Sequence, residues 1–179
     1  MKNLNQTISR VVILFSIFAM GLLNAQTLNA KSSKIVVNGT SSLHDWDMTA
    51  TAATFSATVN GNTLTNVKFS IPTKTLKSTK GSMMDNKAYK ALKADKNPNI
   101  IFSEGSLPLG KSNVTGKLTV AGTTKNITLP VNVAKNGNSY TITGSESLKM
   151  TEFGMQTPGF LGRKTGDAET VKVTIMADK

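Results

Sequence analysis

The segment best equipped for chemistry holds the one histidine and the one tryptophan of the chain. His44, Asp45 and Trp46 follow one another, and Ser41 and Ser42 stand just before them. A hydrolase brings a nucleophile, a base and an oxyanion stabiliser together, but neighbours on a strand or turn point apart, and no glycine-flanked nucleophile elbow precedes them. An enzyme centred on His44 is therefore the least favoured function. We expect a turn at one end of the fold, with Trp46 packed inside and His44 hydrogen-bonded to backbone.

The composition restricts cofactor chemistry as well. The chain has no cysteine and a single histidine, so the usual ligands of zinc, iron–sulfur and haem sites are missing. We expect no catalytic residue, no metal site and no cofactor.

The N-terminus has the order of a secretory signal peptide. A basic, polar lead is followed by an apolar run of 13 residues, 11–23, and then by small residues. A transmembrane helix needs about 20 residues, so an uncleaved anchor is the less favoured alternative. We predict a signal peptide over residues 1–25, with cleavage after Ala25 or as late as Ala30. Since a lipoprotein needs a cysteine, the expected product is a free periplasmic or secreted protein.

The rest of the chain is strongly basic. Without Lys2 and Arg10, 19 basic residues stand against 10 acidic ones, a net charge of +9. Arg163 is then the only arginine, whereas base readout favours bidentate arginine, and an exported protein is an improbable reader of nucleic acid. We expect no nucleic-acid partner. The charge fits an anionic membrane surface, or it serves solubility alone.

Short alternating segments between Gly and Asn turns fill residues 33–178, which we take as one domain. Residues 127–133 alternate strictly between apolar and polar side chains, the period of a strand with one buried face. The phase slips along the segment that starts at Trp46, which predicts a bulge near Ala53. Eight strands are expected, and their short connections favour antiparallel neighbours.

One segment has a helical period instead. Ser82 is expected as N-cap with Asp85 three residues later, the spacing of a capping box, and Pro98 enforces a stop. An amphipathic helix is therefore predicted over residues 82–96. Seven lysines and two aspartates give residues 74–96 a net charge of +5. The expected apolar face of the helix consists of Met84, Ala88, Ala91 and Leu92.

A sheet that closes on itself has no exposed edge. We therefore predict an all-β fold, an eight-stranded antiparallel barrel with one helix in a crossover; a solid two-layer sandwich is the alternative on pattern alone. An eight-stranded barrel holds its own side chains or one small ligand, and the modest inward side chains here favour an under-filled, apolar interior. The predicted lumen residues, which we expect to contact a hydrocarbon ligand, are Trp46, Phe69, Ile71, Phe102, Leu118, Val120, Leu129, Val131, Ile142, Met150, Phe153 and Val173.

Three blocks of the sequence resemble, in this order, the YceI-like family of exported bacterial proteins, also called polyisoprenoid-binding or lipid-binding domains. They are VKFSIPTKTLKSTKGSMMDNKAYKALKADKNPNIIF, VTGKLTVAGTTKNITLPVNV and LKMTEFGMQTP. The likeness runs from about Lys34 to Ala177, nearly the whole mature chain. The resemblance implies a lipocalin-like barrel that holds an isoprenoid lipid, a quinone-like molecule or a similar amphiphile in its lumen.

The favoured function is non-enzymatic binding, transport or storage of a long-chain amphiphilic lipid. The alternative is an exported protein-interaction or stress-related module, whose barrel is filled and binds no lipid. For the carrier, the helix is expected to cover one mouth of the barrel, with lid residues Met83, Met84, Lys87 and Lys90. Its lysines are a solvated face, or they meet anionic head groups at a membrane or a ligand phosphate.

Overall fold

The computed structural model describes residues 26–157, 159–160 and 163–179. The predicted signal peptide, residues 1–25, lies outside the described residues. The strands, in chain order, are β1 (Gln26–Ser41), β2 (Trp46–Ala50), β3 (Thr54–Asn60), β4 (Thr63–Pro72), β5 (Asn99–Pro108), β6 (Gly110–Val120), β7 (Thr123–Asn136), β8 (Ser139–Lys149), β9 (Gly159–Phe160) and β10 (Arg163–Asp178).

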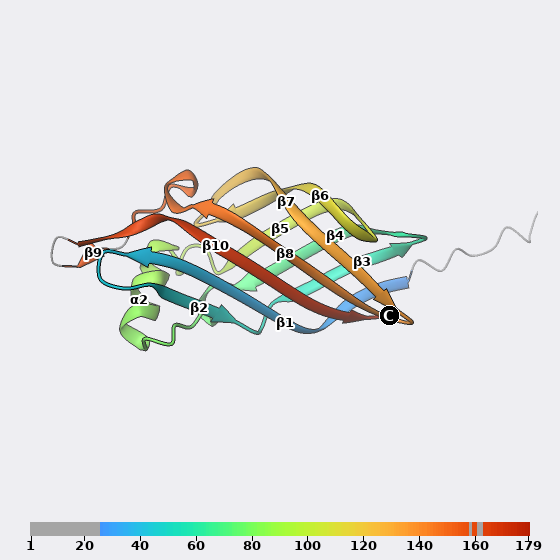
Figure 1. Cartoon of the computed structure of the whole chain (residues 1–179), viewed down its shortest axis with the longest axis horizontal. Helices are drawn as coiled ribbons and strands as arrows, with labels where there is room; N and C mark the ends of the chain where they lie inside the picture. The colour runs from blue at the N-terminus through green and yellow to red at the C-terminus, as the bar shows by residue number, and fades with distance from the viewer. Residues whose placement is uncertain (1–25, 158, 161–162) are drawn as a thin grey trace, which may run out of the picture.

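Eight of these strands form a closed antiparallel barrel in the order β1-β3-β4-β5-β6-β7-β8-β10, and β10 pairs back with β1. Figure 1 shows the strands wound around one axis, with the helix at one end. The predicted eight-stranded barrel is confirmed, and the sandwich alternative is wrong. β2 is an additional strand beside β1, and β9 pairs only with the start of β10.

β1 is long because it pairs with two different strands along the same edge. Residues 26–29 pair with β3, and residues 35–39 pair with β2. Between them, the Ser33 hydroxyl lies 3.2 and 3.3 Å from the carbonyl oxygens of Thr51 and Ala53, and it accepts the Ala53 N–H at 3.1 Å. The bulge predicted near Ala53 is thus a complete break between β2 and β3, and a buried serine satisfies its backbone groups.

β7 and β8 pair over only part of their length. Their ladder runs from Asn136 opposite Ser139 to Val131 opposite Gly144 and stops there. The next residue of β7 is Pro130, which has no N–H to donate and keeps a partner only in β6. β7 and β8 therefore diverge toward the end of the barrel where the helix lies.

The opposite end of the barrel is filled by its own side chains. Six residues there are no more than 2 % exposed: Leu28, Ala57, Leu64, Val133, Tyr140 and Ala177. Ladder pairs join several of them directly, such as Leu28 with Ala57 and Tyr140 with Ala177. Close packing of this kind leaves no room for a ligand at this end.

The crossover between β4 and β5 carries the helix α2 (Ser82–Ala91), which is shorter than the predicted 82–96. Lys93 has a left-handed backbone with φ of 51°. The Ala94 N–H donates to the Tyr89 carbonyl at 2.9 Å and the Lys93 N–H to the Lys90 carbonyl at 3.1 Å. These two bonds form a Schellman motif, so the helix ends well before Pro98.

The predicted N-cap is also wrong. Gly81 occupies the N-cap with φ of 88°, Ser82 is the first helical residue, and no side chain caps the helix. Asp85 accepts the Ser78 N–H at 2.7 Å instead, and its other oxygen lies 3.3 Å from Lys77 Nζ. The carboxylate therefore ties the helix to the chain segment that precedes it. Among the described residues, no helix is long and apolar enough to cross a membrane.

Candidate functional site

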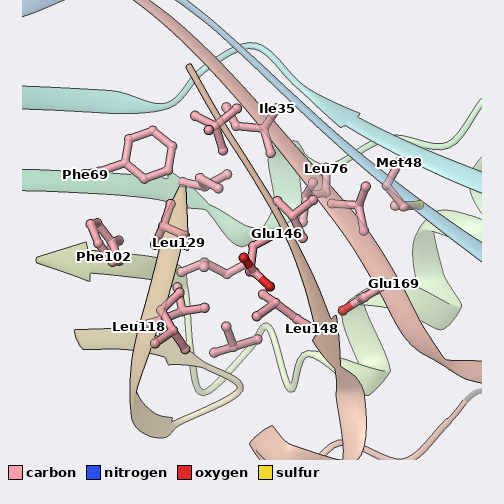
Figure 2. A pocket seen from close by; sticks show the side chains of 18 of the residues that line it. Ile35, Met48, Phe69, Leu76, Phe102, Leu118, Leu129, Glu146, Leu148 and Glu169 are labelled. Carbon is pink, nitrogen blue, oxygen red and sulfur yellow. The ribbon is translucent and has the colours of Figure 1, made fainter. Parts of the chain in front are cut away.

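A cavity of about 210 Å³ is enclosed by side chains of the barrel and of α2, the helix that lies at one end of the barrel in Figure 1. Every strand of the barrel contributes to its wall, together with β2 and α2. The lining is apolar except for Lys87, Ser145, Glu146, Thr165 and Glu169. Figure 2 shows the aliphatic and aromatic side chains that converge on this space. An apolar cavity of about 150 Å³ already admits benzene, so this one has room for part of a hydrocarbon chain.

Eleven of the twelve predicted lumen residues lie on the cavity wall: Trp46, Phe69, Ile71, Phe102, Leu118, Val120, Leu129, Val131, Ile142, Met150 and Val173. The period of two that selected them also brings them together in space. Their contact with a ligand stays a prediction.

Phe153 is the exception. It is buried, 2 % exposed, but it does not line the cavity. The chain leaves β8 at Lys149 and turns into the 3-10 helix η2 (Met150–Phe153). The alternation that places Leu148 on the wall therefore no longer applies at Phe153, which packs in the core beside the cavity.

The four lid residues on α2 divide by helical geometry. Met84 and Lys87 line the cavity, and Ala88 and Ala91 extend the same face. Met83 is 69 % exposed and lies off the wall, because one residue along a helix turns the side chain by about 100°. Lys90 is exposed as well and does not line the cavity.

Backbone-directed bonds hold α2 in place over the cavity. The Tyr89 hydroxyl lies 2.8 Å from the carbonyl oxygens of both Lys74 and Leu76. Leu76 itself lines the cavity. Together with the Asp85 contacts, these bonds anchor one face of the helix to the segment that enters it, so α2 is a docked element rather than a loose flap.

The turn between β1 and β2 uses its polar groups on its own backbone. Ser41 Oγ donates to the His44 carbonyl at 2.7 Å and accepts the Leu43 and His44 N–H groups at 3.3 Å. The exposed His44 ring places Nδ1 2.9 Å from the carbonyl oxygen of Asp45. The serine hydroxyl and the imidazole thus have separate partners, and no nucleophile–base pair forms here.

Trp46 connects this turn to the cavity. Its ring lines the cavity, and its Nε1–H donates to the Thr40 carbonyl at 3.1 Å. A Cβ at Gly39, the residue opposite Trp46 in the ladder, would overlap the indole ring. A glycine is therefore required beneath the indole, and the one tryptophan of the chain lies on the cavity wall.

Two glutamates that were not among the predicted lumen residues face the cavity. Glu146 of β8 and Glu169 of β10 both line it, and Figure 2 shows their carboxylates among side chains made of carbon. Burial raises the pKa of Glu169 to about 7, and the neighbouring Asp167 contributes to the rise. The sequence pattern could have predicted the position of Glu146, since it alternates in phase with the wall residues Ile142 and Leu148.

The match to a family model covers residues 26–177, under the description YceI-like domain. The chain belongs to the YceI-like family. The span includes all ten strands except the last residue of β10, so the YceI-like domain and the barrel are the same unit. A search of curated proteins finds no match.

Solved structures show the same fold at low sequence identity. BcnA of Burkholderia cenocepacia aligns with a TM-score of 0.68 and 19% identity, over 80% of this chain and 95% of that chain. A polyisoprenoid binding domain from Saccharophagus degradans aligns with a TM-score of 0.62 and 9% identity, over 84% and 97%. The YceI protein of Campylobacter jejuni aligns with a TM-score of 0.54 and 18% identity, over 89% and 88%.

Proposed function

We propose that this YceI-like protein binds a long-chain amphiphilic lipid of the isoprenoid type and carries or stores it in the periplasm without chemical change. The observation that supports this most directly is the apolar cavity under α2. A barrel filled along its whole length would favour the interaction module, whereas only one half of this barrel is filled. The name of the Saccharophagus degradans domain supports the same class of ligand.

The first test measures which lipid, and how much of it, is bound to the exported protein. After purification without detergent and extraction with organic solvent, mass spectrometry is expected to find a lipid at a ratio approaching one per chain. Delipidated protein is expected to take up added farnesol, and the Trp46 fluorescence is expected to change because the indole lines the cavity. Protein that contains no lipid and takes up none would contradict the carrier function.

For export, we propose cleavage after Ala25 rather than after Ala30. A cut after Ala30 would remove residues 26–29, the whole ladder between β1 and β3, and with it Leu28, which is fully buried. A cut after Ala25 leaves β1 complete. The intact mass of the exported protein is expected to correspond to a chain that begins at Gln26. An intact mass that corresponds to a chain beginning at Lys31, or to a chain that still includes residues 1–25, would contradict this proposal.

We also propose that the α2 end of the barrel meets an anionic membrane surface. Lys80, Lys90 and Lys96 are exposed there, while Lys74 and Lys77 form ion pairs with Asp95 and Asp85. α2 and the turn between β1 and β2 lie at the same end (Figure 1), and Met83 and Leu43 are exposed on these two elements.

Binding to vesicles is expected to rise with the content of anionic lipid and to fall between about 0.05 and 0.5 M salt, because each lysine near such a surface contributes about 1 kcal/mol and salt screens it. Co-sedimentation with vesicles measures this. Replacement of Lys80, Lys90 and Lys96 by glutamine is expected to weaken the dependence on lipid charge and salt, because these three lysines are exposed at this end of the barrel. Binding that is insensitive to both lipid charge and salt would show that these lysines only solvate the helix.

A further inference from the structure

Glu146 and Glu169 project into the cavity from neighbouring strands. Glu146 lies opposite Val171 in the ladder between β8 and β10, and Glu169 lies opposite Leu148. The two glutamates are therefore diagonal neighbours on the inner face, a relation that spaces residues by about 7–8 Å. Val171 and Leu148 line the cavity with them. Figure 2 shows both carboxylates turned toward the same space.

These carboxylates are unusual in a wall of this kind. Moving a charge from water to apolar surroundings costs free energy unless a partner compensates it. Within the part of the chain that the structure describes, neither carboxylate has a hydrogen bond or an ion pair, although three ion pairs form elsewhere. The burial that raises the pKa of Glu169 reflects the same cost. The fold gains nothing visible from either group, so a bound molecule is the natural partner.

We propose that the cavity selects lipids whose polar end donates a hydrogen bond and carries no negative charge, an alcohol or an amine, and that Glu146 and Glu169 receive this end. This inference rests on the proposed carrier function and names its ligand class. A carboxylate accepts hydrogen bonds from a hydroxyl or an ammonium group. A phosphate or a fatty-acid carboxylate would instead place like charges together in apolar surroundings.

Lys87 does not reverse this preference. It is the one basic residue among the described residues that line the cavity, and it already has an interaction of its own. Two carboxylates against one ammonium leave the wall acidic when both glutamates are ionised. On β8, Glu146 comes two residues after Gly144, the last residue that pairs with β7, and Glu169 lies opposite Leu148, two residues further along. The acidic pair therefore lies in the part of the wall where β7 and β8 have diverged. A polar end that lies there keeps the apolar tail among the aromatic and aliphatic side chains deeper in the barrel.

The test compares three lipids that share one tail. Farnesol, farnesylamine and farnesyl phosphate are titrated into delipidated protein at pH 8, and Trp46 fluorescence or calorimetry gives each Kd. We expect the alcohol and the amine to bind at least about tenfold more tightly than the phosphate, because like charges in a poorly solvated site repel strongly. Equal binding, or tighter binding of the phosphate, would overturn the proposed selectivity and leave the carrier function intact.

Variants assign the selectivity to the two glutamates. In Glu146→Gln, in Glu169→Gln and in the double variant, farnesyl phosphate is expected to bind more tightly and farnesylamine more weakly. The gap, meaning the ratio of the Kd of farnesyl phosphate to that of farnesylamine, is therefore expected to narrow. Glu152→Gln, at an exposed glutamate of η2 that does not line the cavity, is the matched control and is expected to keep the wild-type gap. An unchanged gap in the double variant would contradict the inference. Binding of none of the three lipids to wild-type protein would overturn the carrier function itself.

Discussion

Val173→Trp is expected to weaken lipid binding by roughly 100-fold while the barrel remains folded. Val173 lies in the middle of β10, between Ile35 of β1 and Gly144 of β8, and its side chain faces the cavity. An indole at this position occupies the space of about four methylenes of a ligand tail, each worth about 0.8 kcal/mol on burial. The lost free energy of about 3 kcal/mol corresponds to a loss of roughly 100-fold in affinity. Farnesol retained by the protein after gel filtration measures the effect.

The control for this variant is one residue away. Thr174 is exposed on the outer face of the same strand, where it pairs with Lys34 and Thr143. Thr174→Trp adds the same indole to the same strand, and lipid uptake is expected to be unchanged. Equal uptake by the Val173 and Thr174 variants, with both shown to be folded by circular dichroism, would mean that lipid does not enter the cavity.

Glu169→Gln is expected to stabilise the protein at pH 8 and to have no effect at pH 4. Burial raises the pKa of Glu169 from 4.5 to about 7. Below pH 4.5 the carboxyl group is protonated in the folded and the unfolded protein alike, so its ionisation contributes no difference. As the pH rises toward 7 the unfolded state loses its proton first, and the folded state is destabilised by up to about 3 kcal/mol. Above pH 7 this penalty is complete.

The amide that replaces the carboxyl group is neutral at every pH, so the variant escapes the penalty. Thermal unfolding in buffers from pH 4 to pH 8 is expected to show a Tm that exceeds the wild-type value by roughly 5–10 °C at pH 8. Among the described residues, the charged groups of this region include Asp167 on β10, Glu146 and Lys149 on β8, and Lys87 on α2. Glu152→Gln controls for a general loss of negative charge. A Tm difference that is the same at pH 4 and pH 8 would refute the assignment to Glu169.

The barrel and most of its inner wall could be predicted because both depend on a local period. Apolar residues at every second position, as in residues 127–133, place their side chains on one face of a sheet whatever the neighbours are. Closure followed from the need to satisfy the edges of eight strands. The lumen residues from Phe69 to Val173 were found by that rule, and it fails only at Phe153, where the strand has ended.

The errors come from features that a period does not encode. The end of α2 is set by the left-handed backbone at Lys93 and two tight hydrogen bonds, although the residues up to Lys96 favour a helix. Asp85 does not take part in the predicted capping box because its carboxylate accepts the N–H of Ser78, in the segment before the helix, instead. Glu146 and Glu169 were not predicted as lumen residues because only apolar residues were considered. The alternation of a strand points a side chain into the barrel whether it is apolar or charged.

The pairing of β1 with β10 has a consequence for how the protein is made. β1 pairs with β2 and β3 along one edge, but its other edge is paired only when the last residues of the chain are present, since Asn29 lies opposite Asp178. Contacts so far apart in sequence form slowly. Until then β1 and β8 are both bare edges that invite association with other chains. The proposed export would therefore couple secretion to maturation, because a molecule delayed at the translocation pore would stay an open, aggregation-prone sheet until its tail had passed through.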